Sequence, residues 1–212
     1  MKTKRVLVLA LCIVFLTSGT SAAGQEGVNA IFMGSGYLLV CNWPGLYFSL
    51  EVKGKKVKPL PQTEHVFFEV DGIVLQVQGA AISDFVKDIK DKRPSDQEIL
   101  AAHRDWESDY VGSALGKKLK VESSPQKLPN GTEALLWKFA MPDGFNCQAK
   151  TQMYLAIVSK DHVLLLNGVV DKTMEDADVQ KYLLDTAATI KISAEPIDVK
   201  KLSEAIKKGN PN

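Results

Sequence analysis

The chain has 212 residues, of which 45% are hydrophobic and 24% charged, and its 26 basic and 25 acidic residues give a formal net charge of +1. This length and apolar content suit one domain that buries a sizeable core. The balanced charge excludes the strongly basic surface with which nucleic-acid-binding proteins attract phosphates.

The first 23 residues follow the three-part pattern of a secretory signal peptide. A basic start precedes an apolar run at residues 6–16, and small and polar residues come next. The basic residues are Lys2, Lys4 and Arg5. The apolar run is about half of the roughly 20 residues that span a bilayer, which favours a cleaved signal over a membrane-spanning helix. Cleavage after Ala22 and cleavage after Ala23 both place small residues where they are needed.

Removal of residues 1–23 changes the expected character of the chain. It leaves 23 basic and 25 acidic residues, a formal charge of −2. We expect a periplasmic or secreted protein with no transmembrane segment in its mature part and no affinity for nucleic acid. Cys12 lies inside the discarded run.

The first strands are expected early in the mature chain. Residues 24–61 form either an N-terminal extension or the first strands of an α+β domain at residues 62–193. Two β-rich runs, 37–41 and 46–52, flank a turn at residues 42–45. A hairpin follows, in which Asp71-Gly72 joins residues 66–70 to residues 73–77, because Asp-Gly accepts the positive φ that a two-residue turn requires.

Two helices are expected in the middle of the chain. The first covers residues 83–92. Ser95 begins the second, and Glu98 completes a capping box three residues later. The apolar stripe of this second helix consists of Ile99, Ala102, Trp106 and Tyr110. Gly112 is expected to end it.

The second half of the chain indicates further antiparallel strands followed by helices. The strands are expected at residues 119–122, 133–141, 151–158 and 162–170. The last of them is apolar on both faces, which is typical of a central strand. Thr173 and Asp176 are expected to cap the next helix, and residues 198–208 form a short helix within the C-terminal segment 194–212. This order of elements predicts an α+β fold in which helices flank an antiparallel sheet.

The C-terminal part of the chain resembles PsbP-like domains. The resemblance lies in the run at residues 154–170, in the acidic loop after it, and in the helix that leads to residues 189–192. That group includes the photosystem subunit PsbP and periplasmic lipoproteins of the DcrB kind. The resemblance implies an α-β-α sandwich and an accessory or binding role. It does not extend to residues before Pro61.

Two cysteines, Cys41 and Cys147, remain in the mature chain. An oxidising compartment favours a disulfide between them, which would close a loop of about 100 residues and contribute about 4–5 kcal/mol by the chain-entropy model. The alternative is two separate buried thiols. No Cys-x-x-Cys motif indicates redox catalysis.

Few residues point to catalysis or to a cofactor. His103 and Glu107 lie four residues apart on the long helix, with Asp105 and Asp109 nearby, but zinc needs three or four converging ligands, so a solvated helix face is favoured over a metal site. His162 is interpreted as a turn residue. No nucleophile elbow or nucleotide-binding motif occurs, and we expect neither a metal nor another cofactor.

One turn is a candidate binding surface. Trp43, Leu46 and Tyr47 lie at residues 42–48, and aromatic side chains on an exposed turn are typical of binding hot spots; buried, they belong to the core. The basic C-terminal lysines Lys200, Lys201, Lys207 and Lys208 are interpreted as a solvated helix face, with contact to an acidic lipid or partner as the less favoured alternative.

The favoured hypothesis is an exported, non-enzymatic accessory or binding protein of the cell envelope, whose partner is a protein or a lipid. Two alternatives stay open. One is a hydrolase or metal-dependent enzyme whose site residues are scattered in sequence. The other is a structural subunit of an envelope complex.

Overall fold

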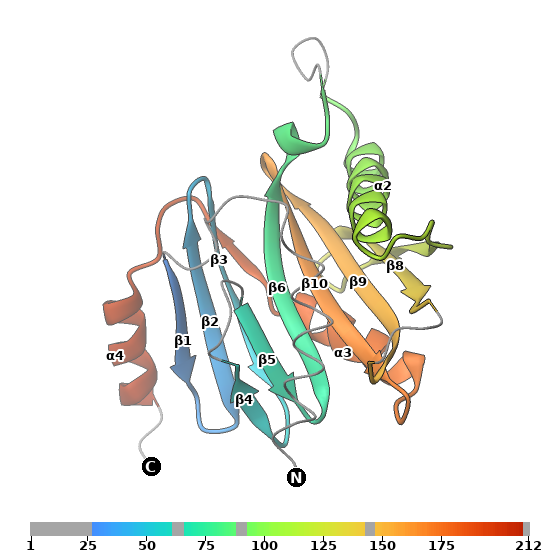
Figure 1. Cartoon of the computed structure of the whole chain (residues 1–212). Coiled ribbons are helices and arrows are strands. Elements are labelled where there is room, and N and C mark those ends of the chain that lie inside the picture. Colours follow the sequence, from blue (N-terminus) through green and yellow to red (C-terminus); the bar gives the residue numbers. More distant parts are fainter. Residues whose placement is uncertain (1–26, 61–65, 88–92, 143–146, 210–212) are drawn as a thin grey trace.

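A computed structural model describes residues 27–60, 66–87, 93–142 and 147–209. Two antiparallel sheets and the helices that flank them make up the architecture (Figure 1). The α+β fold with antiparallel sheets and flanking helices is thereby confirmed. The helices of the described ranges fall short, in length or in apolar character, of what crossing a membrane requires.

The smaller sheet contains the first three strands and one late strand. Its order is β1-β2-β3-β11, and every neighbouring pair is antiparallel. The strands are β1 (Val28–Phe32), β2 (Gly36–Trp43), β3 (Leu46–Lys53) and β11 (Lys191–Ser193). The expected turn between β2 and β3 is present, and Gly45 adopts the positive φ of 77° that favours glycine there.

The larger sheet has the order β4-β5-β6-β10-β9-β8-β7. Its strands are β4 (Val57–Pro59), β5 (Val66–Val70), β6 (Ile73–Ala81), β7 (Glu122–Lys127), β8 (Glu133–Ala140), β9 (Ala149–Ser159) and β10 (His162–Asp171). The hairpin at Asp71-Gly72 is confirmed, with φ of 51° and 97°. The strand expected to be central is β10, and it pairs with β6 and β9 in the middle of the sheet. The strand expected at residues 119–122 begins instead at Glu122.

The helices are a 3-10 turn η1 (Ile82–Asp84), α2 (Asp96–Ala114), α3 (Asp176–Ala187) and α4 (Val199–Gly209). The capping box of Ser95 and Glu98 is confirmed. The helix expected at 83–92 is wrong over its described residues, because only the 3-10 turn forms there, and residues 88–92 lie outside the described ranges.

Two further helix ends differ from expectation. Helix α2 continues past Gly112, and Gly116, with φ of 63°, follows its end. Thr173 does not cap α3, because it bonds to Asp171, and the helix begins after Glu175 without a side-chain cap.

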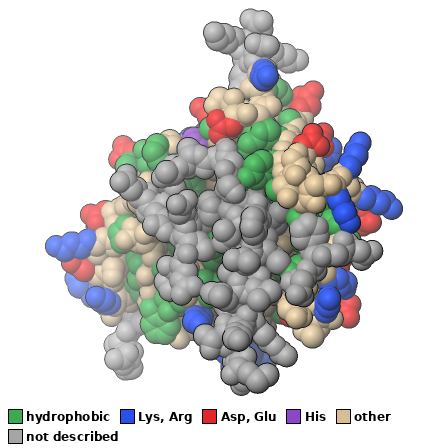
Figure 2. All heavy atoms as spheres, in the orientation of Figure 1, with side chains coloured by type: hydrophobic (Ala, Val, Ile, Leu, Met, Phe, Trp, Pro, Cys, Tyr) green, Lys and Arg blue, Asp and Glu red, His purple; other side chains and the backbone are tan. Residues whose placement is uncertain are grey.

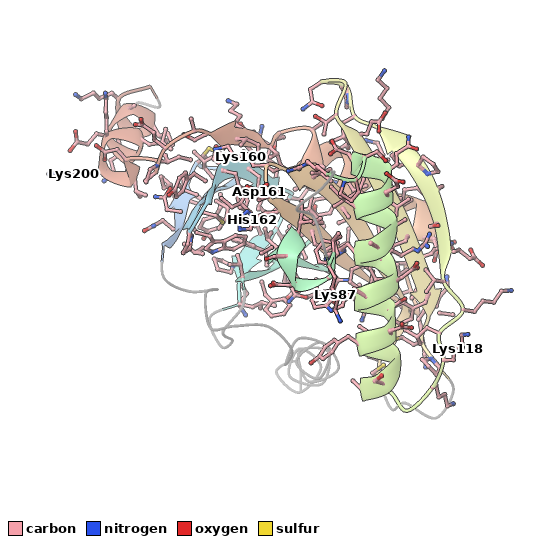
Figure 3. All side chains as sticks on the ribbon, turned by 90° about the horizontal axis from the view of Figure 1, so that it is seen from above. Lys87, Lys118, Lys160, Asp161, His162 and Lys200 are labelled. Atoms are coloured by element: carbon pink, nitrogen blue, oxygen red, sulfur yellow. The ribbon has the colours of Figure 1, made fainter. Side chains whose placement is uncertain are left out.

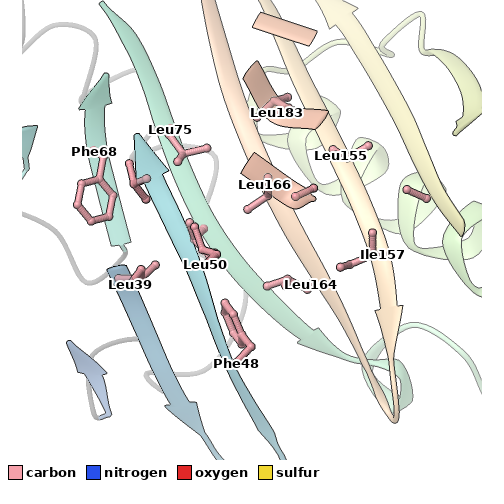
Figure 4. Close-up of a cluster of buried hydrophobic side chains, with 14 of the residues drawn as sticks. Leu39, Phe48, Leu50, Phe68, Leu75, Leu155, Ile157, Leu164, Leu166 and Leu183 are labelled. Atoms are coloured by element: carbon pink, nitrogen blue, oxygen red, sulfur yellow. The ribbon is translucent and has the colours of Figure 1, made fainter. Parts of the chain in front are cut away.

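Helix α2 and the smaller sheet cover opposite faces of the larger sheet. The core between the two sheets also includes α3 and contains Leu39, Phe48, Leu50, Phe68, Leu75, Leu155, Leu164 and Leu183 (Figure 4). A second cluster lies under α2 and includes Ile99, Val111, Trp137, Tyr154 and Val163. The approach of α3 to β10 is close: a Cβ at Gly168 would lie 2.7 Å from a methyl group of Val179.

Candidate functional site

The two cysteines are free and buried, so the disulfide prediction is wrong. Cys41 belongs to the core between the two sheets, whereas Cys147 belongs to a small cluster with Phe67, Val74 and Val169. Phe67 and Phe68 are neighbours in β5 and point to opposite faces of the larger sheet, and Phe68 lies in the core that holds Cys41. The larger sheet therefore separates the two thiols. Burial raises the pKa of the Cys41 thiol above its usual value.

The turn after β2 does not present an aromatic surface. Trp43 is 8% exposed and Leu46 is 1% exposed, and both belong to the core between the sheets. The rings of Trp43 and Phe48 lie edge to face at 5.2 Å. Tyr47 is half-buried. The structure thus places Trp43 and Leu46 of this candidate binding surface in the core, the alternative that the sequence also allowed.

His103 and Glu107 point inward from α2, so their assignment to a solvated face is wrong. Their exposed fractions are 1% and 7%. The His103 ring contacts the rings of Phe85 and Trp106, at centroid distances of 5.1 and 5.8 Å. Burial lowers the pKa of His103 to about 4 and raises the pKa of Glu107 to about 7. At neutral pH this imidazole is therefore uncharged.

Glu107 faces the aromatic layer of the larger sheet. Burial, together with the charge of Glu107, raises the pKa of Tyr154 well above its usual value. The Tyr154 ring stacks on Trp137 at 3.9 Å. Within the described residues, no three side chains of His, Cys, Asp or Glu type gather closely enough to hold a metal ion.

Three amide side chains form a buried row on the face of the larger sheet that carries Tyr154. Gln76 on β6 lies opposite Asn167 on β10, and Asn167 donates from Nδ2 to Oε1 of Gln152 on β9 at 3.1 Å. All three are at most 2% exposed, and Nε2 of Gln76 and Nε2 of Gln152 have no hydrogen-bond partner in the part of the chain that the structure describes. Such unmet donors destabilise the fold unless a water or another acceptor satisfies them.

His162 begins β10, and its half-buried ring lies against the turn at Gly45. Burial lowers its pKa. Figure 3 places it beside Lys160 and Asp161, at the hairpin that Arg93 holds through a bond to Asp161 of 2.8 Å.

A cleft of about 770 Å³ lies between β1 and α4. Residues 29–34 line one side, and Val199, Ser203 and Ile206 line the other, with Lys207 at the rim. Helix α4 runs alongside β1 at the edge of the smaller sheet and in the same direction (Figure 1). We call this the β1–α4 cleft.

The sequence of α4 explains its position. Val199, Leu202, Ser203 and Ile206 recur at the helical spacing and are half-buried, while no residue of the helix is fully buried. Asn42 fixes the segment that leads into α4. Its Nδ2 donates to the carbonyl of Ile197 at 2.9 Å, and the Ile197 amide donates to Oδ1 of Asn42 at 2.8 Å. The helix is therefore anchored at one end and lightly packed along its length.

Among the residues that the structure describes, one edge of strand β1 pairs with no other strand, and we call it the free edge of β1. The bonds that join Gly27 to Asn42 and Met33 to Gly36 belong to the ladder between β1 and β2. Because paired residues alternate in an antiparallel ladder, Asn29 and Ile31 bond to β2, and the amides and carbonyls of Val28, Ala30 and Phe32 point away from it. Those outward groups have no hydrogen-bond partner among the described residues.

Charge gathers on the outer side of α4. Lys200, Lys201, Lys207 and Lys208 are exposed, against one exposed carboxylate, Glu204. Figure 2 shows lysine side chains at the left edge of the molecule, where α4 lies in Figure 1. Figure 3 shows that α4, with Lys200, and α2 lie at opposite ends of the molecule. The cleft combines an apolar interior, unmet backbone groups and a basic rim.

The sequence predicts the helix at residues 198–208 but not the cleft that this helix forms with β1. The lysines were identified from the sequence, but their relation to β1 depends on a contact across some 170 residues of chain. One sequence signal was available. The apolar residues of α4 recur on one side, which indicates that this side packs against something.

Comparisons with known proteins add little to this description. No protein-family model matches the chain, and no curated protein does. Among solved structures, the chain is similar to cyanobacterial PsbP (CyanoP) from Synechocystis sp. PCC 6803, with a TM-score of 0.40 and 14% identity, over 84% of this chain and 99% of that one. A likeness at that score carries no argument, and the α+β assignment stands on the strands and helices described above. A relation to DcrB-like lipoproteins stays a prediction.

Proposed function

We propose that the protein is an exported, non-enzymatic accessory protein of the cell envelope that binds another protein through the β1–α4 cleft. The observation that carries the proposal is the free edge of β1 beside a lightly packed basic helix. An exposed strand edge is a ready template for pairing, and proteins without a use for one normally cover or blunt it. Here the exposed edge opens into a cleft of a size typical of ligand sites.

Export is the part of this proposal that rests on the sequence. The basic start, apolar run and small residues of positions 1–23 support it. The mass of the protein recovered from the periplasm or medium tests it, and the expected mature chain begins at Ala23 or Gly24. An intact chain that stays in the cytoplasm would contradict export and leave the binding proposal to be judged separately.

A photo-crosslinking residue at Ser203 tests the binding proposal in the native envelope. Ser203 lines the cleft without being fully buried. We expect a discrete protein adduct from this position and none from the same residue at Lys172, an exposed position in the turn before α3. Reversal of charge at Lys207 and Lys208 should abolish the adduct.

The partner identified by mass spectrometry must then bind the purified protein directly, and must do so more weakly when the two lysines are reversed. Equal yields of adduct from Ser203 and Lys172 would refute the use of this cleft. Partner affinity that is unchanged by charge reversal at Lys207 and Lys208 would refute it as well.

A further inference from the structure

We propose that the occupant of the β1–α4 cleft is an extended segment of a partner protein, acidic at both ends of an apolar centre, which binds as an additional strand along β1. This inference rests on the proposed function and deepens it by naming the form and chemistry of the bound segment. Three features of the cleft, namely hydrogen bonding, packing and charge, carry it independently.

The hydrogen-bonding groups of β1 favour an extended backbone. The amides and carbonyls of Val28, Ala30 and Phe32 point outward at alternate residues, and an added strand satisfies all of them at once. A helix or a lipid surface does not present donors and acceptors at that spacing. The strand is five residues long, so the bound segment covers about 17 Å at 3.3 Å per residue.

The walls of the cleft favour an apolar centre. Ile31, which pairs with Leu38 of β2, lines the cleft from β1, and Val199 and Ile206 line it from α4. Side chains of an added strand alternate between its two faces. Those that face α4 therefore meet apolar side chains, whereas Phe32, 62% exposed, offers a further apolar contact at the end of the strand.

The lysines favour acidic flanks. Lys200 and Lys201 begin α4, and Lys207 and Lys208 end it. Seven residues separate Lys200 from Lys207, about 10 Å along a helix axis, a distance that an extended chain covers in about three residues. Acidic side chains three or four residues apart therefore match the spacing of Lys200 and Lys207, which share one flank of the helix, and basic ones are repelled; Lys207 itself lines the cleft. An anionic membrane would satisfy these lysines but not the edge of β1.

A defined probe tests the proposal on the purified exported protein. The probe is the blocked pentapeptide ETVTE, in which the two acidic residues and the central valine share one face, and its counterpart KTVTK has the opposite charge. We expect ETVTE to slow hydrogen exchange at the amides of Val28, Ala30 and Phe32, with little change at Asn29 and Ile31, whose amides already bond to β2. KTVTK should not protect these amides. An ETVTE in which alternate amides are N-methylated should bind more than about tenfold more weakly, because it lacks the donors for the edge.

Two variants separate edge pairing from charge. Ala30→Pro removes one outward amide and leaves the ladder to β2 intact, so it should retain the fold and weaken ETVTE binding by more than about tenfold. Lys207→Glu should weaken binding in a salt-dependent way, and Lys172→Glu should not. The thermal unfolding of each variant is measured alongside.

Several results would overturn the proposal. They are an absence of protection at millimolar ETVTE, equal protection by KTVTK, or binding of vesicles rich in anionic lipid without binding of the peptide. One combination of results would refute strand addition but support the proposed function. In that case the Ser203 adduct is lost on charge reversal, whereas both the adduct and peptide binding persist in Ala30→Pro.

Discussion

Replacement of Glu107 by Gln should make the protein more stable at neutral pH, and by more as the pH rises. Burial under α2 raises the pKa of this carboxyl from an ordinary 4.5 to about 7. The folded protein therefore holds the proton more tightly than the unfolded chain does. The stability that the protonated form supplies is complete below pH 4.5 and is lost as the pH rises through 7.

The magnitude follows from the difference between the two values. About 2.5 pH units correspond to about 3 kcal/mol of unfolding free energy, of which about 2.5 kcal/mol falls between pH 5 and pH 7.5. Glutamine is neutral throughout and shows none of this loss. His103 acts in the opposite direction, because burial lowers its pKa to about 4 and acidification from 6.5 to 4 destabilises the fold. That contribution is common to both proteins and cancels in their difference.

Urea unfolding at pH 5 and pH 7.5 measures the effect. The stability of Glu107→Gln relative to the unmodified protein should increase by about 2.5 kcal/mol between the two conditions. Asp109→Asn removes the same charge from the exposed side of the same helix and serves as the control for loss of a carboxylate. A difference between Glu107→Gln and the unmodified protein that is equal at both pH values would refute the reasoning.

Three further predictions concern the fold. Gly168→Ala should destabilise the protein by about 1–3 kcal/mol in urea unfolding, because its methyl group would overlap α3, whereas Gly209→Ala, in open space, should change little; equal effects would contradict the packing described. Asn42→Ala should speed trypsin cleavage within α4 several-fold with a smaller effect on global unfolding, since it removes both bonds at the helix start. Thiol titration should find both Cys41 and Cys147 reduced after unfolding of the purified protein, and oxidised protein with no thiols would show that the cysteines do pair.

Local sequence signals predicted local structure well. Asp71-Gly72 supplied the positive φ of a tight turn, and Ser95 with Glu98 supplied both bonds of a capping box. These features depend on residues a few positions apart, so the sequence contains all the information they need.

The inward face of α2 was harder to predict. The expected stripe included Trp106, which is only half-buried, whereas His103 and Glu107 are buried instead. Apolar residues occur on more than one side of this helix, and which side faces the sheet depends on Phe85 and on the aromatic rings of the larger sheet. Residue type alone disfavours burial of a carboxyl group and so indicated the wrong side.

Relations between distant segments were beyond the sequence. The spacing of Cys41 and Cys147 says nothing about which side of a sheet each occupies, and compartment chemistry alone favoured a bridge. The β1–α4 cleft needs residues 28–32 and 199–209, which are far apart in sequence, to meet, and its free edge is a property of strand order. The sequence predicted the basic amphipathic helix but not its neighbour.

Isotope-filtered NMR of labelled protein bound to ETVTE tests the central claim most directly. Strand addition predicts backbone contacts from successive alternate residues of the peptide to Val28, Ala30 and Phe32, together with contacts from its valine to Ile206. Contacts confined to the lysine side chains of α4, or to any other face of the molecule, would contradict it.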